Sequence, residues 1–207
     1  MTTVTQAYEF IARGGWIMIP LAGTSIYSLS LIIERALSLR ASQVCPSHIL
    51  AQLISLVREK KLAEAMALCR SIDVPLTRVV RSGLEIIHMD RGQVIEEYDR
   101  TGRKEILNLE RHLTMLGSIA AAGPLLGLFG TVTGMIKTFS AIRVVGIGNP
   151  LELSAGISEA LLSTAGGMIV GIPALIFHRY FLRKIDEYAS VFEGVCQDAI
   201  QYLKDGR

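Results

Sequence analysis

The sequence predicts an all-α integral membrane protein with three transmembrane helices, its N-terminus outside the cell and its C-terminus inside. Apolar residues make up 50% of the chain and charged residues only 19%, three long runs carry almost no charge, and helical periodicity dominates the remainder. The predicted segments are a periplasmic N-terminus 1–13, transmembrane helices 14–33, 113–136 and 153–177, a cytoplasmic helical domain 34–112, a periplasmic loop 137–152 and a cytoplasmic helical tail 178–207.

The first predicted span covers Gly14–Ile33, twenty residues without a charge. At a rise of about 1.5 Å per residue such a helix reaches roughly 30 Å, the thickness of the hydrocarbon core of a bilayer. A cleaved signal peptide is the alternative, but Arg13 is the only basic residue before the run and no small-residue cleavage site follows it. The run is therefore predicted to stay in the protein as a helix.

The second and third spans are longer. Leu113–Ile136 is uncharged for twenty-four residues, and Leu153–Phe177 contains a single ionisable residue, Glu159. Both exceed the length that the buried core helix of a soluble domain needs, and both can cross a bilayer with some tilt. These two runs are the strongest membrane signals in the chain.

The distribution of basic residues sets the predicted orientation. One Lys or Arg precedes span one, thirteen lie between spans one and two, two lie between spans two and three, and five follow span three. Because segments that stay in the cytoplasm are enriched in Lys and Arg near the ends of spans, the region between spans one and two and the C-terminal tail are placed inside. The N-terminus is then outside.

The cytoplasmic region is predicted to be helical throughout. Helical stretches are expected over His48–Ile72 and Pro75–Met89, and a third begins after Gly92 and keeps helical spacing into span two. Span two is accordingly predicted to extend into the cytoplasm as one long helix, and span three to do the same through the tail.

Apolar residues in the tail recur at alternating steps of four and three, which indicates a heptad seam. Such a seam packs against a neighbouring helix, either of the same chain or of another subunit. The seam residues are Phe181, Ile185, Tyr188, Phe192, Val195, Ala199 and Tyr202.

Several functional classes find no support in the sequence. The three cysteines are far apart without a CxxC pair, and the four histidines are scattered, so that free thiols and surface or helix-end histidines are expected rather than disulfides or a metal site. A net charge of +2 without a basic, aromatic-rich run argues against a nucleic-acid partner. No nucleophile, acid–base pair or phosphate-binding loop predicts an enzyme, and no cofactor is expected.

Small residues form a stripe along each of the last two spans. Such stripes let helix backbones approach closely in lipid, where tight packing replaces the hydrophobic effect between helices. The stripes consist of Gly123, Gly127, Gly130 and Gly134 in span two and of Gly156, Ala160, Ser163, Gly167, Gly171 and Ala174 in span three.

Polar residues lie within these apolar runs. Glu159 costs roughly 2.5 to 3.5 kcal/mol near the centre of a membrane helix, and such residues tend to face a bundle interior or a wet cavity. Its place two turns into the run also allows snorkelling to the interface. Thr131, Thr133 and Thr164 can bond to their own helix or face a polar path. A path for ions would need several copies of the chain or a partner protein.

Three segments resemble the MotA/TolQ/ExbB proton-channel family: GPLLGLFGTVTGMI at Gly123–Ile136, GISEAL at Gly156–Leu161 and IPA at Ile172–Ala174. The three-span layout extends the resemblance over most of the chain, and within the family the chain is most similar to ExbB. The resemblance implies that Thr131 and Thr164 line the ion path, that Glu159 is the pore-side glutamate, and that Pro124 and Pro173 shape the helices.

The resemblance also implies an assembly. It predicts a homo-pentameric ring in the bacterial inner membrane around an ExbD-like single-span protein that carries the main proton-binding aspartate. The ring would use the proton motive force to drive a TonB-like protein, with H⁺ as the transported ion and Na⁺ as an alternative raised by Thr133. A TolQ-like role in envelope maintenance and a non-conducting membrane scaffold are the other two readings of the same sequence.

Overall fold

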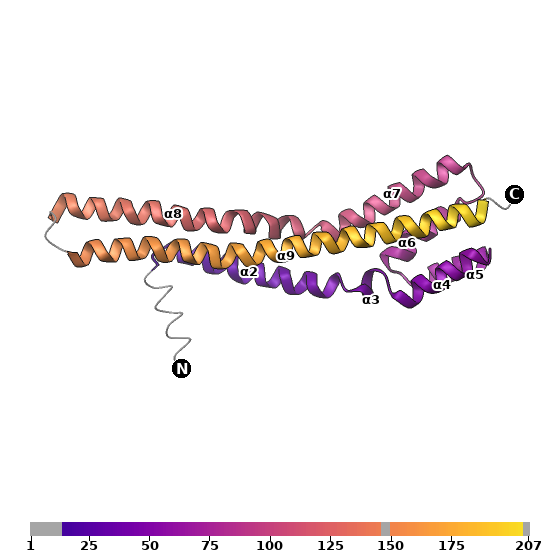
Figure 1. Cartoon of the computed structure of the whole chain (residues 1–207), viewed down its shortest axis with the longest axis horizontal. Helices are drawn as coiled ribbons and strands as arrows, with labels where there is room; N and C mark the ends of the chain where they lie inside the picture. Colours follow the sequence, from indigo (N-terminus) through magenta and orange to yellow (C-terminus); the bar gives the residue numbers. More distant parts are fainter. Residues whose placement is uncertain (1–13, 146–149, 205–207) are drawn as a thin grey trace, which may run out of the picture. The chain divides into compact units, whose positions relative to one another are not determined.

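The computed structural model describes residues 14–145 and 150–204, and within them the secondary structure is helical with no strand. The prediction of an all-α fold is confirmed for this part of the chain. The predicted N-terminal segment 1–13, residues 146–149 of the predicted loop and residues 205–207 lie outside it. The helices are α2 (Met18–Ser38), α3 (Ala41–Val44), α4 (Ser47–Arg58), α5 (Leu62–Ser71), α6 (Pro75–Glu85), α7 (Arg91–Glu110), α8 (Leu113–Val145) and α9 (Pro150–Lys204), as Figure 1 shows.

Within the described residues, two helices are long and apolar enough to cross a membrane, over Leu113–Ser140 of α8 and Ser154–Gln201 of α9. Both contain a predicted span, and α8 begins at Leu113, the first residue of the second predicted span. α2 covers most of the first predicted span but runs from Met18 to Ser38, later along the chain than the run 14–33. α8 and α9 also extend into the predicted loop 137–152 from both sides.

The chain divides into two units. Unit 1 takes the chain up to Ile33 and Thr114–Arg179, and unit 2 takes Glu34–Leu113 and the chain from Tyr180 onward. The division falls at the ends of the predicted spans.

Unit 1 is built from α2, α8 and the first part of α9. α8 and α9 run antiparallel and side by side, because Gly117 lies against His178 near one end and Gly134 against Ala160 near the other. α2 joins them through Met18, whose side chain packs against Gly166 of α9.

The outer surface of unit 1 is apolar on all three helices. Large aliphatic and aromatic side chains stand exposed there, far more than the surface of a soluble domain carries, and lipid or another protein chain must cover them. They include Ile19, Ile26 and Leu29 of α2, Leu125, Leu128, Val132 and Ile136 of α8, and Leu161, Ile169, Ile172 and Ile176 of α9.

The predicted single helix running from the cytoplasmic region through span two is wrong. α7 ends at Glu110 and α8 begins at Leu113. In an unbroken helix the Leu109 carbonyl would accept the amide of Leu113. It accepts instead a hydrogen bond from Arg35 Nη1 at 3.1 Å, so a side chain from α2 satisfies the backbone group that the break leaves free. α9, by contrast, is continuous over 55 residues, as predicted for the third long helix.

The stretch His48–Ile72 is likewise two helices rather than one. α4 ends at Arg58, and Lys60 takes a left-handed backbone conformation with φ 58° before α5 begins at Leu62. This reverses the chain so that α5 packs back against α4. No glycine or proline marks the turn, and helical periodicity alone therefore did not reveal it.

The starts of the next two helices follow local sequence signals. Pro75 opens α6, where its missing amide and fixed φ suit a first helical position. Asp90 caps α7 by accepting a hydrogen bond from the amide of Gly92 at 3.0 Å, and the Gln93 side-chain oxygen accepts one from the Asp90 amide at 3.3 Å.

The tail of α9 supplies the core of unit 2. Six of the seven predicted seam residues are buried, from Phe181 to Ala199, and the side chain of Tyr202 lies outside the described residues. Tyr188 also donates a hydrogen bond to the Leu39 carbonyl at 2.9 Å. Of the two partners that the heptad seam allowed, the structure therefore shows the chain's own helices.

Candidate functional site

The α8–α9 contact in unit 1 is made by backbone against backbone. A Cβ added at Gly167 would lie 2.6 Å from the Gly123 carbonyl oxygen, and one added at Gly127 would lie 3.0 Å from the Cα atom of Thr164. The contact continues along the helices at Gly130, which faces Ser163. The small residues thus allow a spacing that any larger side chain would open.

Pro124 contributes to the same contact. Its ring packs against Gly171 of α9, where an added Cβ would lie 2.5 Å from the Pro124 Cδ atom. Because proline has no amide hydrogen, the Ala120 carbonyl one turn earlier loses its usual donor, and Gly171 also lies next to that oxygen. Pro173 lies inside α9, about two and a half turns beyond Thr164.

The two threonines singled out by the sequence both lie on the stretch of α8 and α9 around Gly127. Thr164 Oγ1 donates a hydrogen bond across the helix contact to the Gly127 carbonyl at 3.3 Å. Thr131 is one turn from Gly127 on α8 and donates to the Leu128 carbonyl of its own helix at 2.6 Å. Both side chains are half-buried, so that each hydroxyl keeps free acceptor capacity beside the small-residue contact.

Thr133 forms only a local bond. Its hydroxyl donates to the Gly130 carbonyl at 3.1 Å, the backbone bonding that is usual for a threonine in a helix. Thr131 makes the same kind of bond to the carbonyl three residues earlier, so this bond does not distinguish Thr133 from Thr131.

Glu159 has a different set of neighbours. Its Oε1 atom lies 2.5 Å from Lys137 Nζ of α8, and its carboxylate lies directly over Gly15, where any side chain would collide with it. In an ideal helix Glu159 and Thr164 point about 140° apart. The structure therefore places Thr164 opposite Gly127, one turn from Thr131, and places Glu159 with Lys137 and the turn that precedes α2.

Lys137 and the turn at Gly15 are the neighbours of Glu159 that sequence reasoning missed. In the sequence, Lys137 directly follows the uncharged run Leu113–Ile136, and it counts toward the predicted orientation as one of the two basic residues between spans two and three. A signal was nevertheless present, because a lone cation ends one span and a lone acid lies in the next. Opposite charges isolated in two membrane helices are candidates for pairing.

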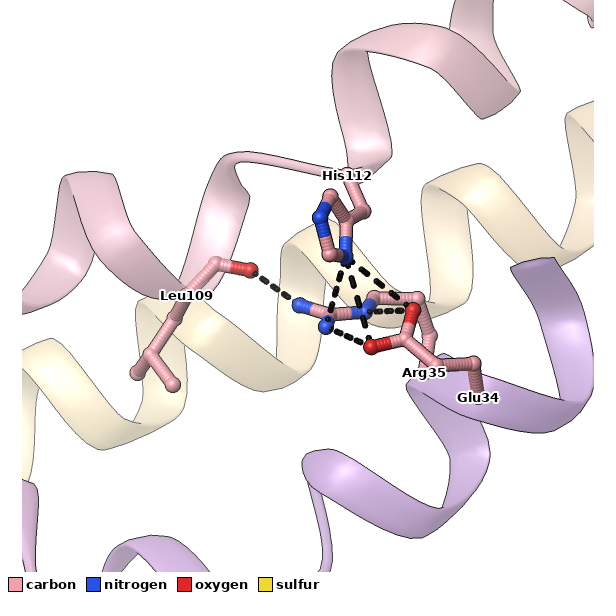
Figure 2. Close-up of polar contacts among 4 residues, drawn as sticks. All are labelled: Glu34, Arg35, Leu109 and His112. Atoms are coloured by element: carbon pink, nitrogen blue, oxygen red, sulfur yellow. Dashed lines mark hydrogen bonds and ion pairs between the residues drawn. The ribbon is translucent and has the colours of Figure 1, made fainter.

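A second polar cluster lies in unit 2, beside the break between α7 and α8 (Figure 2). Arg35 is only 5% exposed, donates to both carboxylate oxygens of Glu34 and to the Leu109 carbonyl, and lies 3.0 Å from His112 Nδ1. The Arg35 guanidinium, with His112 as a smaller influence, holds the pKa of Glu34 below its ordinary value. This cluster ties the end of α2 to the end of α7.

His112 bonds differently in its two protonation states. Its Nδ1 atom also lies 3.1 Å from Glu34 Oε2. An Nδ1 atom without a hydrogen accepts from Arg35, whereas an Nδ1 atom that carries a hydrogen donates to Glu34. His112 is therefore part of an ion-pair cluster rather than the ordinary helix-end residue that the sequence suggested.

The remaining candidate groups carry no visible chemistry. Cys45, Cys69 and Cys196 are free and buried, as expected, and burial raises the pKa of the Cys69 thiol to about 11, which keeps it protonated. Among the described residues, no group of three or more His, Cys, Asp or Glu side chains could hold a metal ion.

A helical protein with apolar outer faces and polar side chains beside a small-residue helix contact is a membrane protein of the channel or transporter class. This chain belongs to the MotA/TolQ/ExbB proton channel family, whose model matches residues 71–194. The match covers the second and third predicted spans and about half of unit 2.

Individual relatives agree with the family. The ExbB-like 1 protein of Synechocystis sp. is 30% identical over 203 residues, covering 92% of this chain and 78% of its own length. The biopolymer transport protein ExbB of Aquifex aeolicus is 33% identical over 55% of this chain and 76% of its own length. The Tol-Pal system protein TolQ of Pseudomonas aeruginosa is 27% identical over 80% of this chain and 76% of its own length. The chain is thus a proton channel subunit of the ExbB/TolQ kind.

Proposed function

We propose that this chain forms the ring of an ExbB-like motor in the bacterial inner membrane. Five copies would surround an ExbD-like single-span partner, and ion flow down the proton motive force would drive a TonB-like protein that energises outer-membrane transport. The observation that carries the proposal is the pair Thr131 and Thr164, two half-buried hydroxyls that lie beside one helix contact in a chain of this family.

The proposed mechanism uses these hydroxyls as relay groups. Each has unused acceptor capacity, and each is held by a backbone carbonyl, so that a proton or cation bound to a partner carboxylate can exchange with them without an unpaired charge in the membrane. Moving one charge through the membrane potential releases about 2.3 kcal/mol per 100 mV, which is the energy available to move the partner helices.

The proposal includes three spans with the N-terminus outside. The exposed apolar side chains of α2 support a lipid-facing third helix beside α8 and α9. Cysteines introduced at Ser140 and Glu96 test the orientation, since the three native cysteines are buried. A membrane-impermeant thiol reagent applied from outside should label Ser140→Cys and leave Glu96→Cys unlabelled, and the opposite pattern would reverse the topology.

The decisive experiment measures ion flux into liposomes that contain this chain with and without its ExbD-like partner, under separate H⁺ and Na⁺ gradients. Flux should require the partner and fall with Thr131→Val or Thr164→Val. Thr24→Val is the matched control, because Thr24 makes the same kind of backbone bond in α2, to the Leu21 carbonyl at 2.9 Å. Equal, non-zero flux in all three variants would contradict the role of Thr131 and Thr164 in the pathway, whereas no flux from a verified complex would favour the non-conducting scaffold.

The similarity to TolQ over most of the chain makes a role in envelope maintenance the second candidate. Complementation separates the two functions. Restored TonB-dependent uptake in a strain lacking ExbB supports the proposal, whereas restored envelope integrity in a strain lacking TolQ, without restored uptake, supports the TolQ-like role.

A further inference from the structure

An ion pair joins α8 and α9 within unit 1. Lys137 Nζ lies 2.5 Å from Glu159 Oε1, and the side chains are 52% and 22% exposed. The acid is therefore the more enclosed partner, and the lysine reaches it from a more open position. Opposite charges at this distance attract, and Lys137 compensates the charge of Glu159.

The same carboxylate rests on the turn Gly14–Ile17 that leads into α2. Gly15 has φ 74°, a conformation that favours glycine, and the absence of a side chain there leaves the space that the carboxylate fills. Ser163, one turn after Glu159 on α9, donates a hydrogen bond to the Gly14 carbonyl at 2.9 Å. Glu159 and Ser163 thus dock this turn against α9.

The turn has a further contact on α8. The indole of Trp16 meets the Phe129 ring edge to face, with 6.2 Å between ring centroids. Phe129 precedes the Gly130-Thr131 pair, so that the turn lies close to the segment carrying one of the two proposed pathway hydroxyls. All these residues belong to unit 1.

We propose that Lys137 is a positioning residue for ion passage, which holds Glu159 against the Gly14–Ile17 turn and keeps this carboxylate from taking up an ion. This inference rests on the proposed function. A cation that is to bind Glu159 must first displace the Lys137 ammonium, because both compete for one carboxylate. The exposure of Lys137 gives it room to swing away, and the turn is then free to leave Glu159.

Trp16 reports on the docked turn without any measurement of flux, because it is the only tryptophan in the chain. Quenching of Trp16 fluorescence by iodide is measured on the full chain in nanodiscs. Lys137→Gln should increase quenching, since the turn loses its anchor. Lys137→Arg should restore the wild-type signal, and so should the exchange Lys137→Glu with Glu159→Lys. Arg143→Gln, which removes an exposed cation from the same helix, is the matched control.

Ion flux into liposomes that contain the ExbD-like partner tests the second part of the proposal, the effect of Lys137 on ion passage. Lys137→Gln should raise ion flux about threefold to fivefold. This ratio of rates corresponds to the free energy that a partly exposed ion pair contributes. Lys137→Arg and Arg143→Gln should stay at the wild-type rate. Unchanged quenching in Lys137→Gln would overturn the docking role. Changed quenching with unchanged flux would overturn the effect on ion passage and leave a purely structural pair.

The two proposals fail in different ways. If the wild-type complex conducts no ion, the proposed function is contradicted, and so is the effect of Lys137 on ion passage. The quenching series still decides whether Lys137 docks the turn. If the wild type conducts and Lys137→Gln matches it in both measurements, only the inference about Lys137 is wrong.

Discussion

The helix contact at Gly167 allows a quantitative test, because the atoms that face it are all backbone. A methyl group introduced by Gly167→Ala would lie 2.6 Å from the Gly123 carbonyl oxygen, 2.8 Å from Gly127 Cα and 2.9 Å from the Gly127 nitrogen. Favourable contacts between carbon atoms lie at about 3.5–4.0 Å. The two helices would therefore have to separate locally by roughly 1 Å.

The expected cost follows from two opposing effects. Overpacking of a close contact destabilises by about 1–3 kcal/mol, and replacing a glycine inside a helix stabilises by about 1 kcal/mol. Gly167→Ala should thus lower the free energy of unfolding by up to about 2 kcal/mol. The same separation would lengthen the 3.3 Å bond from Thr164 to the Gly127 carbonyl beyond hydrogen-bonding distance, so that ion flux should fall as well.

Gly23→Ala is the matched control. An added Cβ at Gly23, on α2 of the same unit, meets no atom within 4 Å, and only the gain in helix propensity is expected. The assay is denaturant unfolding of the full chain in detergent micelles, followed by far-UV circular dichroism. A Gly167→Ala variant as stable as Gly23→Ala would refute the close backbone contact.

Three further predictions concern unit 2, each measured by unfolding of the full chain. The Tyr98 hydroxyl is buried without a hydrogen-bond partner in the described part of the chain, so Tyr98→Phe should raise the unfolding free energy by about 1 kcal/mol; a loss of stability would reveal a partner. Arg35→Gln should lower it by about 1.5–3 kcal/mol, because the Leu109 carbonyl and Glu34 lose a charged donor; a neutral effect would contradict the cap at the helix break. Glu34 has a depressed pKa in the folded state, so the stability it contributes is present above its unfolded pKa and is lost as pH falls below about 4.5. Wild type should therefore lose more stability than Glu34→Gln on acidification through that range, and parallel losses would show that the Glu34–Arg35 pair is not retained in the folded protein.

Much of the fold follows from local sequence. The uncharged run Leu113–Ile136 is helical because apolar residues and helix formers continue through it without interruption, and Pro75 and Asp90 mark helix starts through their backbone chemistry. The small-residue stripes predicted close helix packing, and residues such as Gly123 and Gly167 do lie in backbone contact. The match to the family confirms the class that the motifs of spans two and three indicated.

Contacts between distant residues could be settled only by the tertiary structure. Periodicity gives each helix an apolar face, but it does not say which element covers that face. The partner of the α9 seam is decided by tertiary packing, which buries the seam within unit 2. The break after Glu110 has no glycine or proline signal in the local sequence. The group that stabilises it is Arg35, which is far away in the chain. Lys137 and Glu159 each looked like an isolated charge in the sequence, and only the antiparallel packing of α8 and α9 places them together. Charges and spans are properties of local sequence, whereas an ion pair depends on a distance that only the packed helices fix.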